Sequence, residues 1–78
     1  EENNHKPILY PNPANNVLNI SKISQNGILE IIDINGKIIF SKEINQTTQI
    51  NTKEYKKGIY IVSYKTIKQK FTQLISIN

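Results

Sequence analysis

The chain has 78 residues, enough for one small domain, and all of the positive charge behind its net +4 comes from lysine because arginine is absent. It has no cysteine, which excludes disulfides and thiolate metal sites, and no run approaches the roughly 20 apolar residues of a membrane span. The lysines are scattered and lack the arginine forks and exposed aromatics typical of nucleic-acid binding, so they indicate a solvated surface and no nucleic-acid partner. The missing apolar run predicts no direct membrane insertion.

Residues 1–7 are polar and unpatterned, and we interpret them as the remnant of a linker in front of a domain that spans residues 8–78. His5 lies in this linker with no cysteine, carboxylate or second histidine patterned around it. We therefore do not expect His5 to be a metal ligand or a catalytic base.

Isoleucine is the most abundant residue, with sixteen copies, and its branched side chain suits a pleated sheet better than a helix. The first predicted strand is residues 8–10, and residues 11–16 follow it as a turn. Pro11 and Pro13 flank Asn12 and fix the backbone there, so the turn is expected to be rigid. Residues 17–20 form the next predicted strand, and residues 21–27 a loop.

Two strand-forming runs, residues 28–34 and 37–44, are joined by Asn35-Gly36 and predict a β-hairpin. Two registers are compatible with this spacing. A two-residue type I′ loop places Ile34 opposite Lys37. A type I turn that begins at Asp33 places Asp33 opposite Lys37 instead.

Aspartate at the first position of this turn and Gly36 at the fourth favour the second register, with Gly36 left-handed in a bulge. That register also predicts Ile31 opposite Ile39. Both faces of the hairpin are apolar, so the alternation of side chains does not decide the matter. The expected faces are Leu29, Ile31 and Ile39 on one side and Ile32, Ile38 and Phe40 on the other.

Residues 47–51 predict a short strand and residues 52–57 a connection that contains Tyr55, which resembles the corner tyrosine of sandwich folds. Gly58 then opens a strand over residues 59–66, residues 67–68 form a loop, and residues 69–77 form the last strand. About seven short strands without a helical period predict an all-β fold, an Ig-like antiparallel β-sandwich.

Candidate catalytic groups are few, since the chain has one histidine and one aspartate. Asp33 is explained by its turn, and no metal-binding spacing, phosphate loop or nucleophile motif is present. We therefore predict a protein that is not an enzyme and has no cofactor. Tyr60 and Tyr64 share a strand face with Val62 and could stack on sugars or bases, but we interpret this face as part of the core.

Three segments together resemble a known family. Tyr10-Pro11-Asn12-Pro13 precedes a short apolar strand, residues 29–37 end in Asp33, Gly36 and Lys37, and residues 57–62 carry Gly58 and Tyr60 ahead of Lys70 in the last strand. Their order over residues 8–78 is similar to the C-terminal sorting domain (Por secretion tail, type A) of cargo proteins for the type IX secretion system of Bacteroidota.

The resemblance implies an Ig-like sandwich of about seven strands that directs an N-terminal cargo domain of the same polypeptide across the outer membrane. An outer-membrane shuttle protein is the implied receptor, and a sortase-like cysteine peptidase the implied processing enzyme. The cargo would be exported, in transit through the periplasm and then at the outer-membrane surface or outside the cell. The residues carried over are Pro11, Asn12, Pro13, Asp33, Gly36, Lys37, Gly58, Tyr60 and Lys70.

The end of the sequence departs from the family, because residues 72–78 lack the basic final residues common in it. We hypothesise that the last strand lies at a sheet edge and docks to the receptor by strand addition; the alternative is that it only completes the fold. Two other functions remain open from the sequence: an Ig-like or fibronectin-like binding module for carbohydrate or a surface protein, and a basic OB-like nucleic-acid binder.

Overall fold

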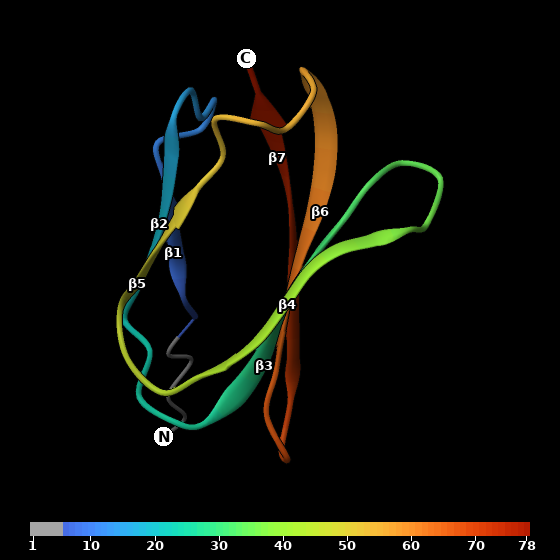
Figure 1. The fold of residues 1–78 in the computed structure, drawn as a ribbon. Helices are drawn as coiled ribbons and strands as arrows, with labels where there is room; N and C mark the ends of the chain where they lie inside the picture. Colours follow the sequence, from blue (N-terminus) through green and yellow to red (C-terminus); the bar gives the residue numbers. More distant parts are fainter. Residues whose placement is uncertain (1–5) are drawn as a thin grey trace.

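The computed structural model describes residues 6–78, which fold into two antiparallel sheets packed face to face (Figure 1). The three-stranded sheet has the order β1-β2-β5 and the four-stranded sheet the order β4-β3-β6-β7. The strands are β1 Ile8–Tyr10, β2 Val17–Ser21, β3 Gly27–Ile32, β4 Ile38–Ile44, β5 Thr48–Asn51, β6 Gly58–Lys65 and β7 Lys70–Ile77.

This architecture confirms the predicted all-β sandwich. Packing of β1-β2-β5 against β3-β6-β7 is the Ig-like arrangement, with β4 added beside β3. Within residues 6–78, no helix is long and apolar enough to cross a membrane. The predicted strands match the observed ones to within two residues at each end.

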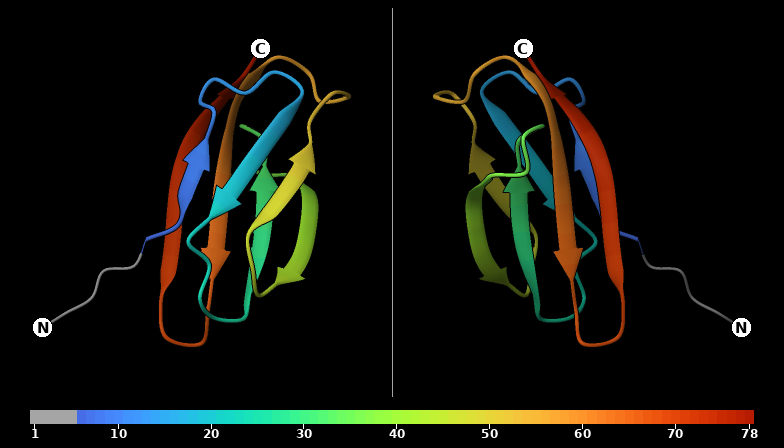
Figure 2. Two further views of the ribbon diagram at one scale, coloured as in Figure 1. Left: turned by 90° about the vertical axis from the view of Figure 1, so that its left-hand side faces the viewer. Right: turned by 90° about the vertical axis from the view of Figure 1, so that its right-hand side faces the viewer.

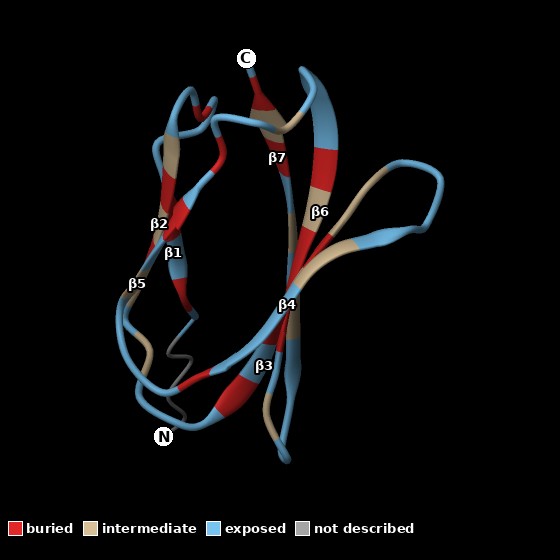
Figure 3. Cartoon of the chain, in the orientation of Figure 1, coloured by how far each residue is buried: buried red, intermediate tan, exposed pale blue. Residues whose placement is uncertain are grey.

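The core lies between the sheets and is built by alternate residues of the strands (Figure 3). Leu18 and Ile20 enter it from one sheet, and Leu29 and Ile31 from the other, all with no exposed surface. Complete burial of an aliphatic side chain of this size contributes about 1.5–3 kcal/mol each. The same alternation places Ile75 and Ile77 of the last strand in the core.

The hairpin between β3 and β4 has the predicted bulged turn. Asp33 N–H donates to the carbonyl of Lys37 at 2.9 Å, which places these residues opposite each other, and Gly36 has a φ of +89°. The predicted pairing of Ile31 with Ile39 is wrong, because Ile31 lies opposite Phe40. The register shifts by one residue after the pair of Ile32 and Ile38, so β4 carries one extra residue there.

This second bulge brings both Ile39 and Phe40 partly against the core. It corrects the predicted faces of the hairpin: Phe40 shares the inner face with Ile31, and Ile38 shares the outer face with Ile32. Because β4 is an edge strand that pairs only with β3, the extra residue disrupts hydrogen bonds on one side of the strand only.

The predicted core face of β6 is confirmed, since Tyr60, Val62 and Tyr64 are all buried. The Tyr60 hydroxyl donates to the carbonyl of Lys56 at 2.5 Å, and the Tyr64 hydroxyl donates to the carbonyl of Gln25. One strand therefore anchors a loop at each end of the sandwich. Neither ring is available as a stacking platform for sugars or bases.

Candidate recognition surface

The three sequence motifs lie at the same ends of their strands. Strands β1, β3, β5 and β7 run toward this end, and β2, β4 and β6 start from it. The loops over residues 11–16 and 52–58 lie there with the end of β7 (Figure 2), whereas the tip of the β3–β4 hairpin projects to the side, apart from them (Figure 1). We call this region the motif end and define it as residues 11–16, 33–37, 52–58 and 76–78. Lys70 lies at the opposite end of β7, apart from the other candidate residues.

The Pro-Asn-Pro loop is attached to the last strand. The Asn12 side-chain oxygen accepts a hydrogen bond from Ser76 N–H at 3.0 Å. Pro11 and Pro13 are exposed on either side of it, and the peptide bonds before both prolines are cis. Asn12 thus acts inside the fold, by supplying an acceptor to a strand edge beside two residues that cannot donate.

Ala14 continues this attachment and has no exposed surface. It forms a parallel bridge with Ile77: Ala14 N–H donates to the carbonyl of Ser76, and Asn78 N–H donates to the carbonyl of Ala14, both at 2.8 Å. The loop between β1 and β2 therefore joins the edges of the two sheets, β1 and β7. A single alanine in a loop gave no signal of this role in the sequence.

The Asp33 turn is held by the aspartate side chain. Its Oδ1 accepts hydrogen bonds from Asn35 N–H and Lys37 N–H, each at 2.9 Å, and Gly36 N–H donates to the Asp33 carbonyl at 3.0 Å. Asp33 and Gly36 are thereby explained as turn residues. The side chain of Lys37 is exposed at the tip of the hairpin and remains available to a partner.

The third motif closes the motif end over the connection between β5 and β6. Gly58 has a φ of +150°, a backbone conformation that favours glycine, and an added Cβ would meet nothing within 4 Å. Tyr55 lies against Tyr60, with ring centroids 5.9 Å apart. Burial, and secondarily the neighbouring Tyr60, raises the pKa of Tyr55. The loop-capping hydroxyl is that of Tyr60, so the predicted corner role of Tyr55 is wrong.

Thr52 is a second residue that sequence reasoning missed. It is 1% exposed, its N–H donates to the carbonyl of Asn16 at 2.9 Å, and its hydroxyl donates to the carbonyl of Asn15 at 3.3 Å. Threonine after a strand is unremarkable in a sequence. Here it joins the connection between β5 and β6 to the Pro-Asn-Pro loop.

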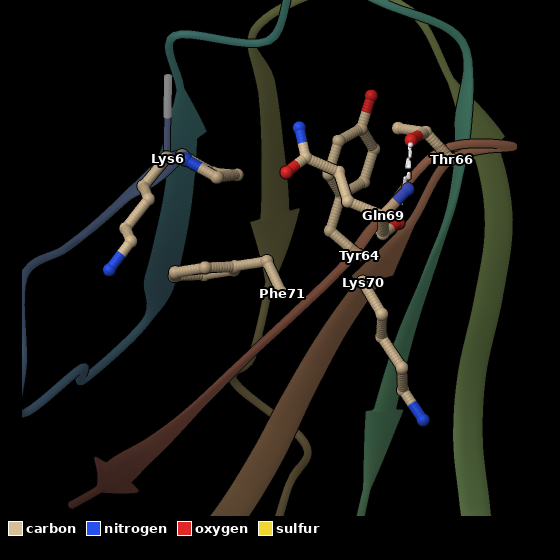
Figure 4. A pocket seen from close by; sticks show the side chains of 7 residues that line it. Lys6, Tyr64, Thr66, Gln69, Lys70 and Phe71 are labelled. Carbon is tan, nitrogen blue, oxygen red and sulfur yellow. Dashed lines mark hydrogen bonds between the residues drawn. The ribbon is translucent and has the colours of Figure 1, made fainter. Parts of the chain in front are cut away.

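Lys70 begins β7 at the opposite end, beside a pocket of about 90 Å³ (Figure 4). Lys6, Tyr64 and Phe71 line it, together with Thr66 and Gln69 of the turn between β6 and β7. Binding sites for small molecules usually have volumes of about 300 Å³ or more, so this pocket does not support a ligand site. The exposed side chain of Lys70 is available to a partner.

Nothing in the described part of the chain resembles a metal centre, because residues 6–78 contain no group of three or more His, Cys, Asp or Glu that could hold an ion. His5 lies outside the described residues.

The comparison with known protein families identifies the family of the chain. The family described as Secretion system C-terminal sorting domain matches residues 8–78. The chain belongs to this family. No curated protein matches the chain.

As a sorting domain of type IX secretion, the chain is a signal attached to a cargo protein, and it interacts with the type IX machinery. A protein that carries such a domain is secreted, to the cell surface or the extracellular space. Domains of this family are typically non-catalytic.

Proposed function

We propose that this sorting domain delivers its cargo from the periplasm to an outer-membrane shuttle protein and is then separated from the cargo by a sortase-like cysteine peptidase. The observation that carries the proposal is the match of the sorting-domain family over residues 8–78, with the loops of its three motifs at the same ends of the strands. A receptor that reads this end recognises the folded domain, because the residues involved come from distant parts of the chain.

The motif residues divide into two groups by their contacts. Asn12, Asp33 and Tyr60 form hydrogen bonds within the domain, and Gly36 and Gly58 adopt positive φ values. This first group shapes the motif end. Pro11, Pro13 and Lys37 are exposed, and their side chains form none of these hydrogen bonds. We assign contact with the shuttle to this second group, since the two prolines are rigid and bind without an ordering cost, and Lys37 adds a positive charge.

Docking by strand addition is supported by the place of β7 at the edge of its sheet. Completion of the fold is supported equally, because Ile75 and Ile77 of the same strand are each 1% exposed. The two roles are compatible, since the core uses side chains and the edge uses main-chain groups. Deletion of residues 74–78 would remove both core isoleucines, so substitutions on the exposed side of β7 are the better test.

The decisive experiment fuses residues 1–78 behind a signal peptide and a fluorescent reporter in a host with a type IX system. We expect the reporter at the cell surface or in the medium, without the domain. Lys37→Glu is expected to reduce export, and Lys68→Glu, an exposed lysine at the opposite end, is the matched control that retains it. Reporter held in the periplasm with the unsubstituted domain contradicts the proposal.

A further inference from the structure

The outer edge of β7 is partly covered. From Ser76 onward, the Pro-Asn-Pro loop occupies it, through Asn12 and Ala14, with three hydrogen bonds of 2.8–3.0 Å. At the other end of the strand, the tight turn bonded from Thr66 N–H to the Gln69 carbonyl at 2.8 Å precedes it. Between these limits lie residues 70–74, whose outer side pairs with no strand among residues 6–78 and which we call the open edge.

The main chain of the open edge points outward at alternate residues. In an antiparallel pair, successive residues direct their N–H and C=O groups to opposite sides. Because Ser76 directs both groups to the Pro-Asn-Pro loop, Leu74, Thr72 and Lys70 direct theirs to the same side, away from β6. The open edge thus offers three residues whose backbone groups can pair with one added strand.

Leu74, Thr72 and Lys70 each stand at the end of a row of neighbouring side chains. Each row crosses the outer face of the four-stranded sheet from β7 to β4, with one residue from each strand. The strand registers place Leu74 next to Ile61, Ile32 and Ile38; Thr72 next to Ser63, Glu30 and Ser41; and Lys70 next to Lys65, Ile28 and Glu43. The first row is therefore aliphatic, the second polar, and the third charged at every position except Ile28.

The first and third rows each end at β7 with a residue that would gain from a further neighbour on an added strand. Leu74 is 62% exposed at the end of an aliphatic row, so an aliphatic neighbour on an added strand would bury apolar surface. Lys70 stands directly opposite Lys65, a like-charge pair that is destabilising in a sheet. An acidic neighbour on the other side of Lys70 would offset this repulsion.

We propose that the open edge binds one extended peptide strand, antiparallel to β7, with an aliphatic residue beside Leu74, a small polar residue beside Thr72 and an acidic residue beside Lys70. From its N-terminus, the bound segment reads aliphatic, any, small polar, any, acidic. The inference builds on the strand-addition docking proposed above and states which partner segment would dock. In strand addition, main-chain hydrogen bonds provide the affinity and alternate side chains provide the specificity.

The test uses the 78-residue chain and the synthetic peptide Thr-Ile-Thr-Ser-Thr-Glu-Thr, with NMR to follow the amides. Binding should slow the hydrogen exchange of the Lys70, Thr72 and Leu74 amides and leave those of Phe71 and Gln73, which face β6, unchanged. Lysine in place of the peptide glutamate should weaken binding roughly threefold to tenfold, the range set by cross-strand pairs of about 1 kcal/mol.

A charge exchange separates specific docking from general attraction to a basic protein. Lys70→Glu should reverse the preference between the two peptides, whereas Lys68→Glu, outside the open edge, should leave it unchanged. Leu74→Thr should weaken both peptides. Thermal unfolding verifies that each variant is folded.

Protection along β4 instead of β7, the same affinity for both peptides, or no binding by the unsubstituted chain would overturn the inference. Protection of the open edge that rises with protein concentration and without peptide would also overturn it, by showing a second copy as the occupant. The export assay is independent: normal export of a Leu74→Thr reporter together with lost peptide binding refutes this inference and leaves the sorting function standing. If the reporter fused to the unsubstituted domain is not exported although this domain binds the peptide, the sorting function is refuted.

Discussion

The motif end and the opposite end of the sandwich, where residues 22–26, 45–47 and 66–69 connect the strands, are closed by different means. At the motif end, Asn12, Ala14 and Thr52 connect loops to each other and to the last strand through five hydrogen bonds, four of them with main-chain donors. At the opposite end, the Tyr64 hydroxyl holds one loop, and Thr66 stabilises a tight turn by accepting from Gln69 N–H at 3.1 Å.

This difference shows that a sequence motif marks a shaped region rather than a set of contact residues. At the motif end, most motif residues are occupied by bonds inside the fold, and only a few side chains are left for a partner. The opposite end carries few motif residues, yet it includes Lys70 and the start of the open edge. The recognition that we propose therefore has two separable parts, which substitutions at the two ends can distinguish.

The largest expected effect is at the motif end. Ile77→Ala should lower the free energy of unfolding by about 2–5 kcal/mol, because Ile77 is 1% exposed and its truncation leaves a cavity. Ile67→Ala, at a position 98% exposed at the opposite end, should change it by less than about 0.5 kcal/mol. Urea denaturation measures both, and equal effects would contradict the described core.

Two glycines at the two ends should respond for different reasons. A Cβ on Gly27 would lie 2.6 Å from the Tyr64 ring and 2.8 Å from the Lys65 carbonyl oxygen, so Gly27→Ala should cost about 1–3 kcal/mol through overpacking. Gly36→Ala should cost about 1–2 kcal/mol through its left-handed backbone.

Asparagine discriminates the two causes. It tolerates the left-handed conformation, so Gly36→Asn should be milder than Gly36→Ala, whereas Gly27→Asn should be worse than Gly27→Ala. Denaturation curves of the four variants provide the comparison. The reverse order at either position would contradict the cause assigned to it.

A smaller effect is expected at Asn12. Asn12→Ala removes the acceptor for Ser76 N–H, so it should cost about 0.5–1.5 kcal/mol and speed hydrogen exchange at that amide. Asn12→Asp keeps an acceptor oxygen in place and should retain slow exchange. If both variants exchange at the native rate, the loop does not guard the edge of β7.

The smallest effect concerns alkaline pH. Burial raises the pKa of Tyr55 at the motif end and of Tyr64 at the opposite end. The folded chain then keeps protons that the unfolded chain loses near its ordinary pKa of about 10, so stability is full below that pH and falls as pH rises above it. Tyr55→Phe and Tyr64→Phe should each flatten this decline in unfolding experiments; an unchanged slope in both would contradict the assignment.

Much of the fold follows from local patterns in the sequence. The seven strands, the Asp33 turn with its left-handed Gly36, and the inward face of Tyr60, Val62 and Tyr64 were all predictable, because each depends on neighbours a few residues apart. The second bulge was not, since both hairpin faces are apolar and a shift by one residue leaves isoleucines on each side.

The residues of the candidate site were chosen from the sequence motifs and remain a prediction, and the geometry of the site was not predictable. Nothing local in Pro11-Asn12-Pro13 indicates that the loop pairs with Ser76, and Ala14 and Thr52 belong to residue types common in any loop. Their roles depend on partners that only the completed fold brings near. Gly27 was assigned to a loop for the same reason, because its close contact is with a ring on a distant strand.

The bond between Asn12 and Ser76 spans 64 positions along the chain, which has a consequence for biosynthesis. While a ribosome is still adding residues 70–78, the four-stranded sheet lacks its last strand and the early loop has no edge to close. Such long-range pairing slows folding to a scale of roughly milliseconds to seconds. The newly made chain therefore passes through an interval in which it is not yet folded, and the Pro-Asn-Pro loop takes its final place only after β7 has paired.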